Sequence, residues 1–160
     1  MATVKSNGNR YDKSYAINNT LDYYGSKGKP GTNWTYWTAY GVDNNDIEIA
    51  KNQMIDTKVK FKHFKGIHMH QIYVQISRGE INGMGLKPAE VSEHKLVDMI
   101  GQYFYSYGLQ SVSFVYRNKP GIFIRMIINS TSVRSGKGIS DFRGFIKELQ
   151  ENLNYYLQNN

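Results

Sequence analysis

A short polar segment at residues 118–121, Asn-Lys-Pro-Gly, constrains the fold more than any other feature of the sequence. Its residues are typical of a tight turn, and an alternating run lies on each side of it. Before the turn, Val112, Phe114 and Tyr116 share one face of a strand, and the run 122–130 follows it. We therefore expect the two runs to pair as an antiparallel hairpin.

The remaining segments alternate between the periodicities of helices and strands. A first strand fits within residues 1–13, and Asp43 or Asn44 is placed to cap a helix. The spacing of apolar residues predicts helices over 14–24, from residue 43 or 44 to about 58, over 88–107 and over 141–158, and strands over 34–40 and 68–77. Such interleaving around a hairpin indicates an α/β fold, a two-layer sandwich with a central, mainly antiparallel sheet covered by helices.

Length and composition narrow the class of protein. A chain of 160 residues suits one domain spanning 1–160. The sequence has no cysteine, which excludes a disulfide framework, a thiolate zinc site and a cysteine nucleophile. No apolar run approaches the ~18 residues of a membrane helix, and the N-terminus lacks the apolar core of a signal peptide. We expect a soluble, cytoplasmic protein without a membrane segment.

The net charge of +7 is unevenly distributed. Two segments are rich in basic residues and contain no acidic one: Lys58, Lys60, Lys62, His63 and Lys65 in the first, and Arg117, Lys119, Arg125, Arg134 and Lys137 in the second. Such segments fit a polyanionic partner, because each neutralised phosphate releases counterions, but they fit a solvated surface equally well. The chain also has 13 Tyr, 7 Phe and 2 Trp, and those that are exposed could stack on unpaired bases.

Common catalytic motifs are missing from the sequence. Residues 135–138, Ser-Gly-Lys-Gly, do not supply a phosphate-binding loop, and there is no Gly-x-Ser-x-Gly motif. His68 and His70 lie two apart on a predicted strand, which is a metal-ligand spacing. Two half-buried histidines at the start of a strand explain the same pattern, so this pair is a weak metal candidate.

The strand after the turn has one unusual face. Ile122, Ile124, Met126 and Ile128 form a core face, whereas the opposite face carries Phe123, Arg125, Ile127 and Asn129. Arg125 could hold a phosphate through charge-assisted hydrogen bonds. It could equally stack on Phe123 at the rim of the sheet.

Four segments, taken in order, resemble the N-terminal nicking domain of relaxases, the mobilisation nucleases of plasmids and integrative conjugative elements. The resemblance covers nearly the whole chain. The segments are 21–24 (Leu-Asp-Tyr-Tyr), 39–43 (Ala-Tyr-Gly-Val-Asp), 74–80 (Val-Gln-Ile-Ser-Arg-Gly-Glu) and 127–130 (Ile-Ile-Asn-Ser), the last followed by Gly136 and Lys137. The resemblance implies an antiparallel sheet covered by helices, a bacterial protein, and a tyrosine that attacks a DNA phosphate. Relaxases usually continue well beyond this domain, so residue 160 need not be a natural end.

The metal-binding residues of that family are substituted in this chain. Counting back from Asn129, the family's two histidines of His-hydrophobic-His fall on Phe123 and Arg125, and its His-x-Asp falls on Tyr116 and Asn118. Phenylalanine does not ligate a metal and arginine repels one. We therefore expect no cofactor and no metal on this strand.

From the resemblance we expect a domain that binds transfer-origin DNA and nicks one strand through a tyrosine without the usual histidine–metal centre, and three mechanisms stay open. Arg125 could replace the metal in stabilising charge at the phosphate, which would give metal-independent nicking. A metal could be rebuilt from His68 and His70. Nicking could also be lost, which would leave a DNA-binding accessory protein, or a protein-interaction domain of the conjugation machinery.

The resemblance also assigns site residues. The catalytic candidates are Tyr23, Arg125 and Asn129, and Tyr11 is an alternative nucleophile. The partner implied is single-stranded or hairpin DNA of a transfer origin, together with other conjugation proteins. The candidate DNA-binding residues are Lys27, Lys29, Arg117, Lys119, Arg134 and Lys137.

Overall fold

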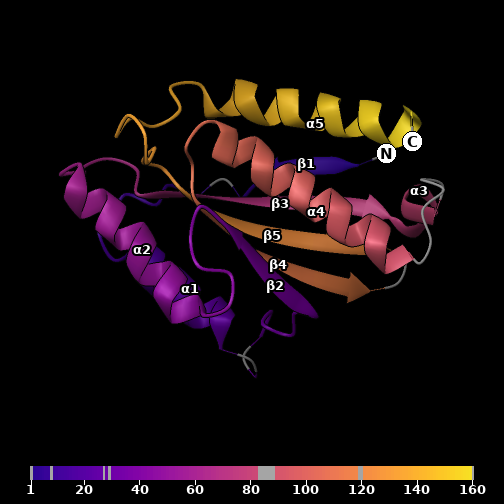
Figure 1. Cartoon of the computed structure of the whole chain (residues 1–160), viewed down its shortest axis with the longest axis horizontal. Helices are drawn as coiled ribbons and strands as arrows, with labels where there is room; N and C mark the ends of the chain where they lie inside the picture. The colour runs from indigo at the N-terminus through magenta and orange to yellow at the C-terminus, as the bar shows by residue number, and fades with distance from the viewer. Residues whose placement is uncertain are drawn as a thin grey trace.

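A computed structural model describes residues 2–7, 9–26, 28, 30–82, 89–118 and 121–159. It contains one sheet of five antiparallel strands in the order β1-β3-β5-β4-β2 (Figure 1). The strands are β1 (Thr3–Ser6), β2 (Tyr36–Tyr40), β3 (Met69–Ser77), β4 (Ser111–Asn118) and β5 (Gly121–Asn129). The predicted hairpin is confirmed as β4 and β5, and the α/β fold with an antiparallel sheet covered by helices is confirmed with it.

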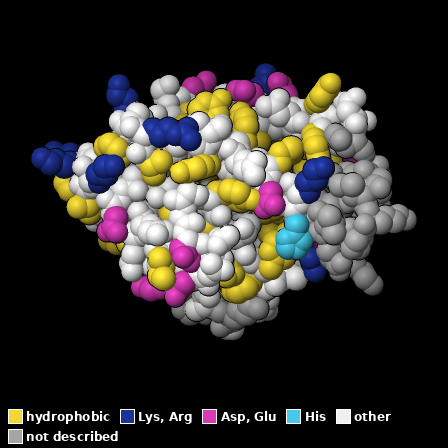
Figure 2. All heavy atoms as spheres, viewed as in Figure 1, with side chains coloured by type: hydrophobic (Ala, Val, Ile, Leu, Met, Phe, Trp, Pro, Cys, Tyr) yellow, Lys and Arg dark blue, Asp and Glu magenta, His cyan; other side chains and the backbone are white. Residues whose placement is uncertain are grey.

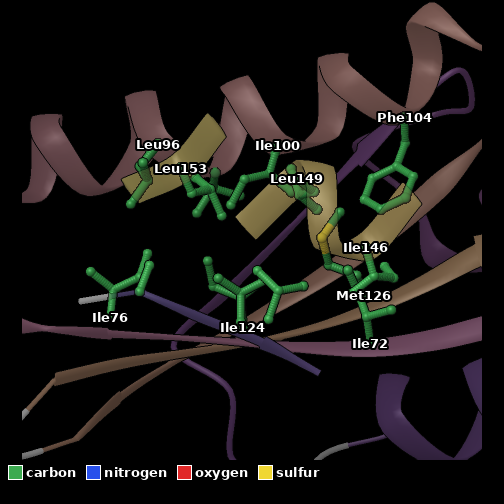
Figure 3. Packing of buried hydrophobic residues seen from close by; sticks show 14 of the residues in the cluster. Ile72, Ile76, Leu96, Ile100, Phe104, Ile124, Met126, Ile146, Leu149 and Leu153 are labelled. Carbon is green, nitrogen blue, oxygen red and sulfur yellow. The ribbon is translucent and has the colours of Figure 1, made fainter. Parts of the chain in front are cut away.

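Two long helices, α4 (Ala89–Ser106) and α5 (Phe142–Asn159), cover one face of the sheet (Figure 1). The alternate residues Ile72, Val74 and Ile76 of β3 point toward these helices and are fully buried. Figure 3 shows Leu96, Ile100 and Phe104 of α4 and Ile146, Leu149 and Leu153 of α5 packed over Ile72, Ile76, Ile124 and Met126. Among the described residues this is the larger of two apolar clusters. Pro88, the predicted start of α4, lies outside the described residues.

Helices α1 (Ala16–Gly25) and α2 (Ile47–Lys60) lie on the opposite face. They bury Ile17, Leu21, Ala50 and Met54 against a patch of the sheet formed by Met69, Val112, Phe114 and Ile127. That patch is only part of the face. Toward the β4–β5 turn, Tyr73, Phe123 and Arg125 on the same face stay half-exposed.

Helix α2 has well-defined ends. The Asp46 carboxylate caps its start by accepting hydrogen bonds from the backbone N–H groups of Glu48 and Ile49, whereas the sequence had pointed to Asp43 or Asn44. The Asp43 carboxylate instead accepts bonds from the N–H groups of residues 45 and 46 and so shapes the preceding turn. At the other end, the His63 N–H bonds to the Lys58 carbonyl at 2.9 Å and Lys62 adopts φ 53°, which is a Schellman motif.

The two remaining features concern the sheet edge and the shortest helix. Strand β1 lies at the edge. The outward backbone N–H groups of Ala2, which precedes the strand, and of Val4 within it donate to Asn154 Oδ1 (2.9 Å) and Gln150 Oε1 (3.1 Å) of α5. A short helix that the sequence had not indicated, α3 (Arg78–Asn82), directly follows β3. None of the helices in the described ranges combines the length and the apolar character that a membrane span requires.

Candidate nucleic-acid interface

Two neighbouring rows of side chains cross the second sheet face where the buried patch meets the half-exposed residues. The register places one row across five strands and a shorter one beside it: Lys5, Tyr73, Arg125, Phe114 and Trp37 in the first, and Thr3, Gln75, Phe123 and Tyr116 in the second. Helix α1 adds Tyr24 from above. We call Tyr24, Tyr73, Tyr116, Phe123 and Arg125 the aromatic face.

Arg125 lies at the centre of the aromatic face. Its guanidinium carbon is 4.0 Å from the ring centroid of Tyr24, 4.9 Å from that of Tyr73, 5.9 Å from that of Phe123 and 6.0 Å from that of Tyr116. The Tyr73 and Phe123 rings are themselves 5.2 Å apart, and those of Tyr116 and Phe123 are 5.9 Å apart. A guanidinium over aromatic rings at these distances is held by cation–π attraction.

A chain of hydrogen bonds orients the arginine from the side of β3. Arg125 Nη1 donates to the Tyr73 hydroxyl at 3.1 Å, and that hydroxyl also accepts from Gln71 Nε2 at 3.3 Å. Gln71 Oε1 in turn accepts from the Tyr11 hydroxyl at 2.7 Å, which accepts from Asn7. Tyr11, the alternative nucleophile, is therefore placed in this chain and away from the guanidinium.

The electrostatics keep Arg125 charged. Burial acts to lower its pKa, but hydrogen bonding and proximity to the hydroxyls of Tyr116, Tyr24 and Tyr73 outweigh it and raise the pKa above its ordinary value. Burial also raises the pKa of the Tyr116 phenol, although Arg125 opposes this. Arg125 Nε is buried and has no hydrogen-bond partner among the described residues, so the guanidinium keeps hydrogen-bonding capacity that these residues do not use.

The Tyr24 ring contacts the Arg125 guanidinium, whereas the neighbouring Tyr23 points its hydroxyl elsewhere. The Tyr23 hydroxyl donates to the Pro30 carbonyl at 2.6 Å, and its ring meets that of Tyr24 edge-on at 4.9 Å. Tyr24 also packs toward Phe114, with ring centroids 6.4 Å apart, so its ring contacts both the buried patch and the arginine.

Asn129, the third predicted catalytic residue, is surrounded by hydrogen-bond partners within the fold. Its side chain is fully buried and donates to the Met54 carbonyl (3.0 Å) and to Gln110 Oε1 (2.9 Å), while its Oδ1 accepts from the Thr131 N–H (3.2 Å). Helix α2 covers this part of the sheet. Asn129 therefore ties α2 and the ends of β4 and β5 together, and its catalytic role stays a prediction.

The predicted DNA-binding cations are dispersed. Arg117 points to the α4 face, where its Nε forms an ion pair with Glu93 at 2.9 Å. Arg134 and Lys137 are exposed in the β5–α5 loop, and Arg134 Nη1 donates to the Ser106 carbonyl at 2.5 Å. Lys27, Lys29 and Lys119 lie outside the described residues. None of the cations described here contacts the aromatic face.

The two histidines considered as metal ligands, His68 and His70, pack against the rings of different residues. The His70 ring stacks on Phe142 at 3.8 Å between centroids, and burial lowers its pKa to about 4. His68 is only 2% exposed and its ring lies 5.7 Å from that of His63. Across the described ranges, no three histidine, cysteine or carboxylate side chains gather into a group that could hold a metal ion.

Sequence reasoning placed Arg125 and Phe123 on the correct face but did not include Tyr73 and Tyr116 in the site. Tyr73 alternates with Ile72 and Val74, so its opposite orientation was available from the strand pattern. A hairpin whose turn has two residues pairs Tyr116 with Phe123, so the position of Tyr116 could also have been predicted. Comparisons of the chain with protein families, curated proteins and solved structures gave no match.

Proposed function

We propose that this chain is a single-stranded-DNA-binding domain that holds the strand on its aromatic face. The observation that carries the proposal is Arg125, a charged side chain set among four half-exposed aromatic rings on an open part of a sheet. Bases stack on aromatic rings whatever their sequence, and an arginine among the rings binds phosphate or a base edge. The resemblance to relaxases favours DNA of a transfer origin as the strand.

The stacking of bases on the rings determines the binding free energy that we expect. Each base stacked on a ring contributes ~1–3 kcal/mol. Phe123 and Tyr73 present neighbouring rings, so two successive bases fit such a surface. The net charge of +7 would attract the strand at long range and make its capture depend on salt.

Binding without cleavage agrees best with the hydroxyl groups at the site. The Tyr116 phenol has a raised pKa and its hydroxyl donates to the Gly31 carbonyl at 2.7 Å. The Tyr23 hydroxyl also donates to a carbonyl, and it would have to give up this hydrogen bond before its oxygen could attack a phosphate. This favours the DNA-binding accessory role that the sequence left open.

Nicking is the second candidate function, favoured by the position of Tyr23 at the margin of the aromatic face. In that reaction the Tyr23 oxygen would bond to the scissile phosphorus, the 3′ oxygen of the neighbouring nucleotide would leave, and the phenolic proton would pass to a base or to solvent. Arg125 would stabilise the charge on the phosphoryl oxygens. It would first have to exchange part of its ring contacts for the phosphate.

Fluorescence anisotropy with a labelled single-stranded oligonucleotide from a transfer origin tests the binding proposal. Phe123→Ala removes a ring from the aromatic face and should weaken binding by roughly 5- to 100-fold, the equivalent of one stacked base. Tyr155→Ala is the matched control, since Tyr155 is a 70% exposed aromatic residue on α5, and it should bind as the unmodified protein does. Equal affinities of all three proteins would contradict the proposal.

A plasmid-nicking assay with the unmodified protein and Tyr23→Phe separates the two candidate functions. We expect neither protein to relax a supercoiled plasmid carrying the transfer origin. Nicking that disappears in Tyr23→Phe would establish the enzyme and overturn the accessory role.

A further inference from the structure

The turn that follows α2 projects from one end of the molecule and exposes apolar side chains among lysines. We call residues 58–66 the α2 tip. Val59 is 58% exposed and Phe64 is 61% exposed, and Lys60, Lys62 and Lys65 are exposed between and beside them. Figure 2 shows basic and apolar side chains projecting together at the end where α2 terminates in Figure 1.

The α2 tip is braced from beneath. Lys58 Nζ bonds to Ser130 Oγ (2.9 Å) and Thr131 Oγ1 (3.0 Å), and His63 Nδ1 lies 2.6 Å from the same Thr131 oxygen. The Schellman motif fixes the backbone above these contacts. The two exposed apolar side chains are consequently presented on a fixed turn that is anchored to the end of β5.

The surroundings of the α2 tip are basic. No acidic residue occurs in the sequence between Asp56 and Glu80. The β5–α5 loop, which carries the exposed Arg134 and Lys137, packs against the tip so closely that a Cβ atom at Gly136 would collide with the Phe61 ring. An anionic partner that also offers an apolar layer would complement this surface.

We propose that the α2 tip docks the protein on the surface of an anionic phospholipid bilayer. Lys60, Lys62 and Lys65 would meet the headgroups, while Phe64 and Val59 would enter the boundary between headgroups and acyl chains. A nucleic acid would use the lysines and could stack on Phe64, but it offers no apolar environment to an aliphatic side chain such as Val59. The pair of exposed apolar residues therefore favours the bilayer.

The docking is reversible, and most of its binding free energy comes from electrostatic attraction between the lysines and the anionic lipids. Each lysine near an anionic bilayer changes the partition coefficient by about fivefold, so the three together contribute about 100-fold. The α2 tip lies beyond the Met69 end of β3, whereas the aromatic face lies toward the β4–β5 turn. The inference therefore does not depend on the proposed DNA binding.

Co-sedimentation with vesicles tests the inference. The unmodified protein should pellet with vesicles of phosphatidylcholine and phosphatidylglycerol in equal parts, and not with vesicles of phosphatidylcholine alone. The triple variant K60Q/K62Q/K65Q should lose about 100-fold in partition coefficient. Lys147→Gln, which removes one exposed lysine of α5 away from the tip, is the single-charge control and should lose no more than about fivefold.

A second pair of variants tests the apolar contribution at constant charge. Phe64→Ser should weaken vesicle binding severalfold, because the ring no longer enters the interface, and Tyr155→Ser should leave it unchanged. Vesicle binding that is indifferent to both the triple variant and Phe64→Ser would overturn the inference. So would loss of oligonucleotide affinity in the triple variant without any vesicle binding by the unmodified protein, since the tip would then be a nucleic-acid contact. Phe123→Ala changes the aromatic face and not the α2 tip, so it should bind vesicles as the unmodified protein does. The DNA-binding proposal can therefore fail without affecting the vesicle result.

Discussion

Lys58 makes a sharp prediction about stability and pH. The side chain is 5% exposed, and burial lowers its pKa from 10.5 to about 7. Its amine has hydroxyl partners in Ser130 and Thr131, and no carboxylate of the described part of the chain bonds to it. In the unfolded chain the amine is in water and regains its ordinary pKa.

The sign of the effect follows from the protons bound in each state. Between pH 7 and 10.5 the unfolded chain holds a proton on Lys58 that the folded chain does not, so the free energy of unfolding rises with pH across this window. Below pH 7 both states are protonated and the full cost of burying the charge is present. One proton over two pH units corresponds to about 2–3 kcal/mol, and we expect a gain of ~2 kcal/mol from pH 7 to pH 9.

Urea unfolding at a series of pH values between 7 and 9 measures this directly. Lys58→Met keeps the length of the side chain and removes the titration, so its free energy of unfolding should be flat over the same window. The histidines with lowered pKa values change the free energy of unfolding only below about pH 6.5, so they do not affect the measurement between pH 7 and 9. A difference below about 0.5 kcal/mol between pH 7 and 9 in the unmodified protein would refute the reasoning, because Lys58 would then be charged in the folded state.

Two further predictions concern stability. Asn129→Ala should destabilise the fold by about 2–4 kcal/mol in urea unfolding, because it leaves the buried Gln110 Oε1 without its donor and the buried Thr131 N–H without its acceptor; a loss below 1 kcal/mol would mean that water replaces the amide. Lys62→Gly should stabilise the fold by about 0.5–1 kcal/mol, since Lys62 holds φ 53° at the position after α2 where glycine is favoured. Destabilisation by this change would show that the Lys62 side chain contributes more than its backbone strain costs.

Much of the fold could be predicted because it depends on local patterns. The residues of the 118–121 turn specified the hairpin, and period-two alternation placed Arg125 and Phe123 opposite the core residues of β5. The ends of the elements were less predictable. Asp46 caps α2 although Asp43 also precedes it, because the choice depends on which carboxylate the turn brings to the first free N–H groups.

The candidate site was harder to predict because alternation identifies a face but not what covers it. Asn129 and Arg125 share one face of β5, yet α2 buries the first and leaves the second at the margin of α1. Which half of a sheet face a helix covers depends on the packing of Ile17, Leu21 and Met54, which are distant in sequence from β5. The same packing turns Tyr24 toward Arg125, and no pattern within α1 alone distinguishes it from a core residue.

The contact of α5 with strand β1 has a consequence for association between copies of the chain. An edge strand normally offers free N–H groups on which a strand of another molecule can align, and this is how sheets extend into aggregates. Here the amide side chains of Asn154 and Gln150 occupy the outward N–H groups of Ala2 and Val4. Helix α5 thus protects this edge of the sheet with two side-chain carboxamides instead of charged residues or a proline. A strand of another molecule could therefore pair at these N–H groups only after α5 had detached.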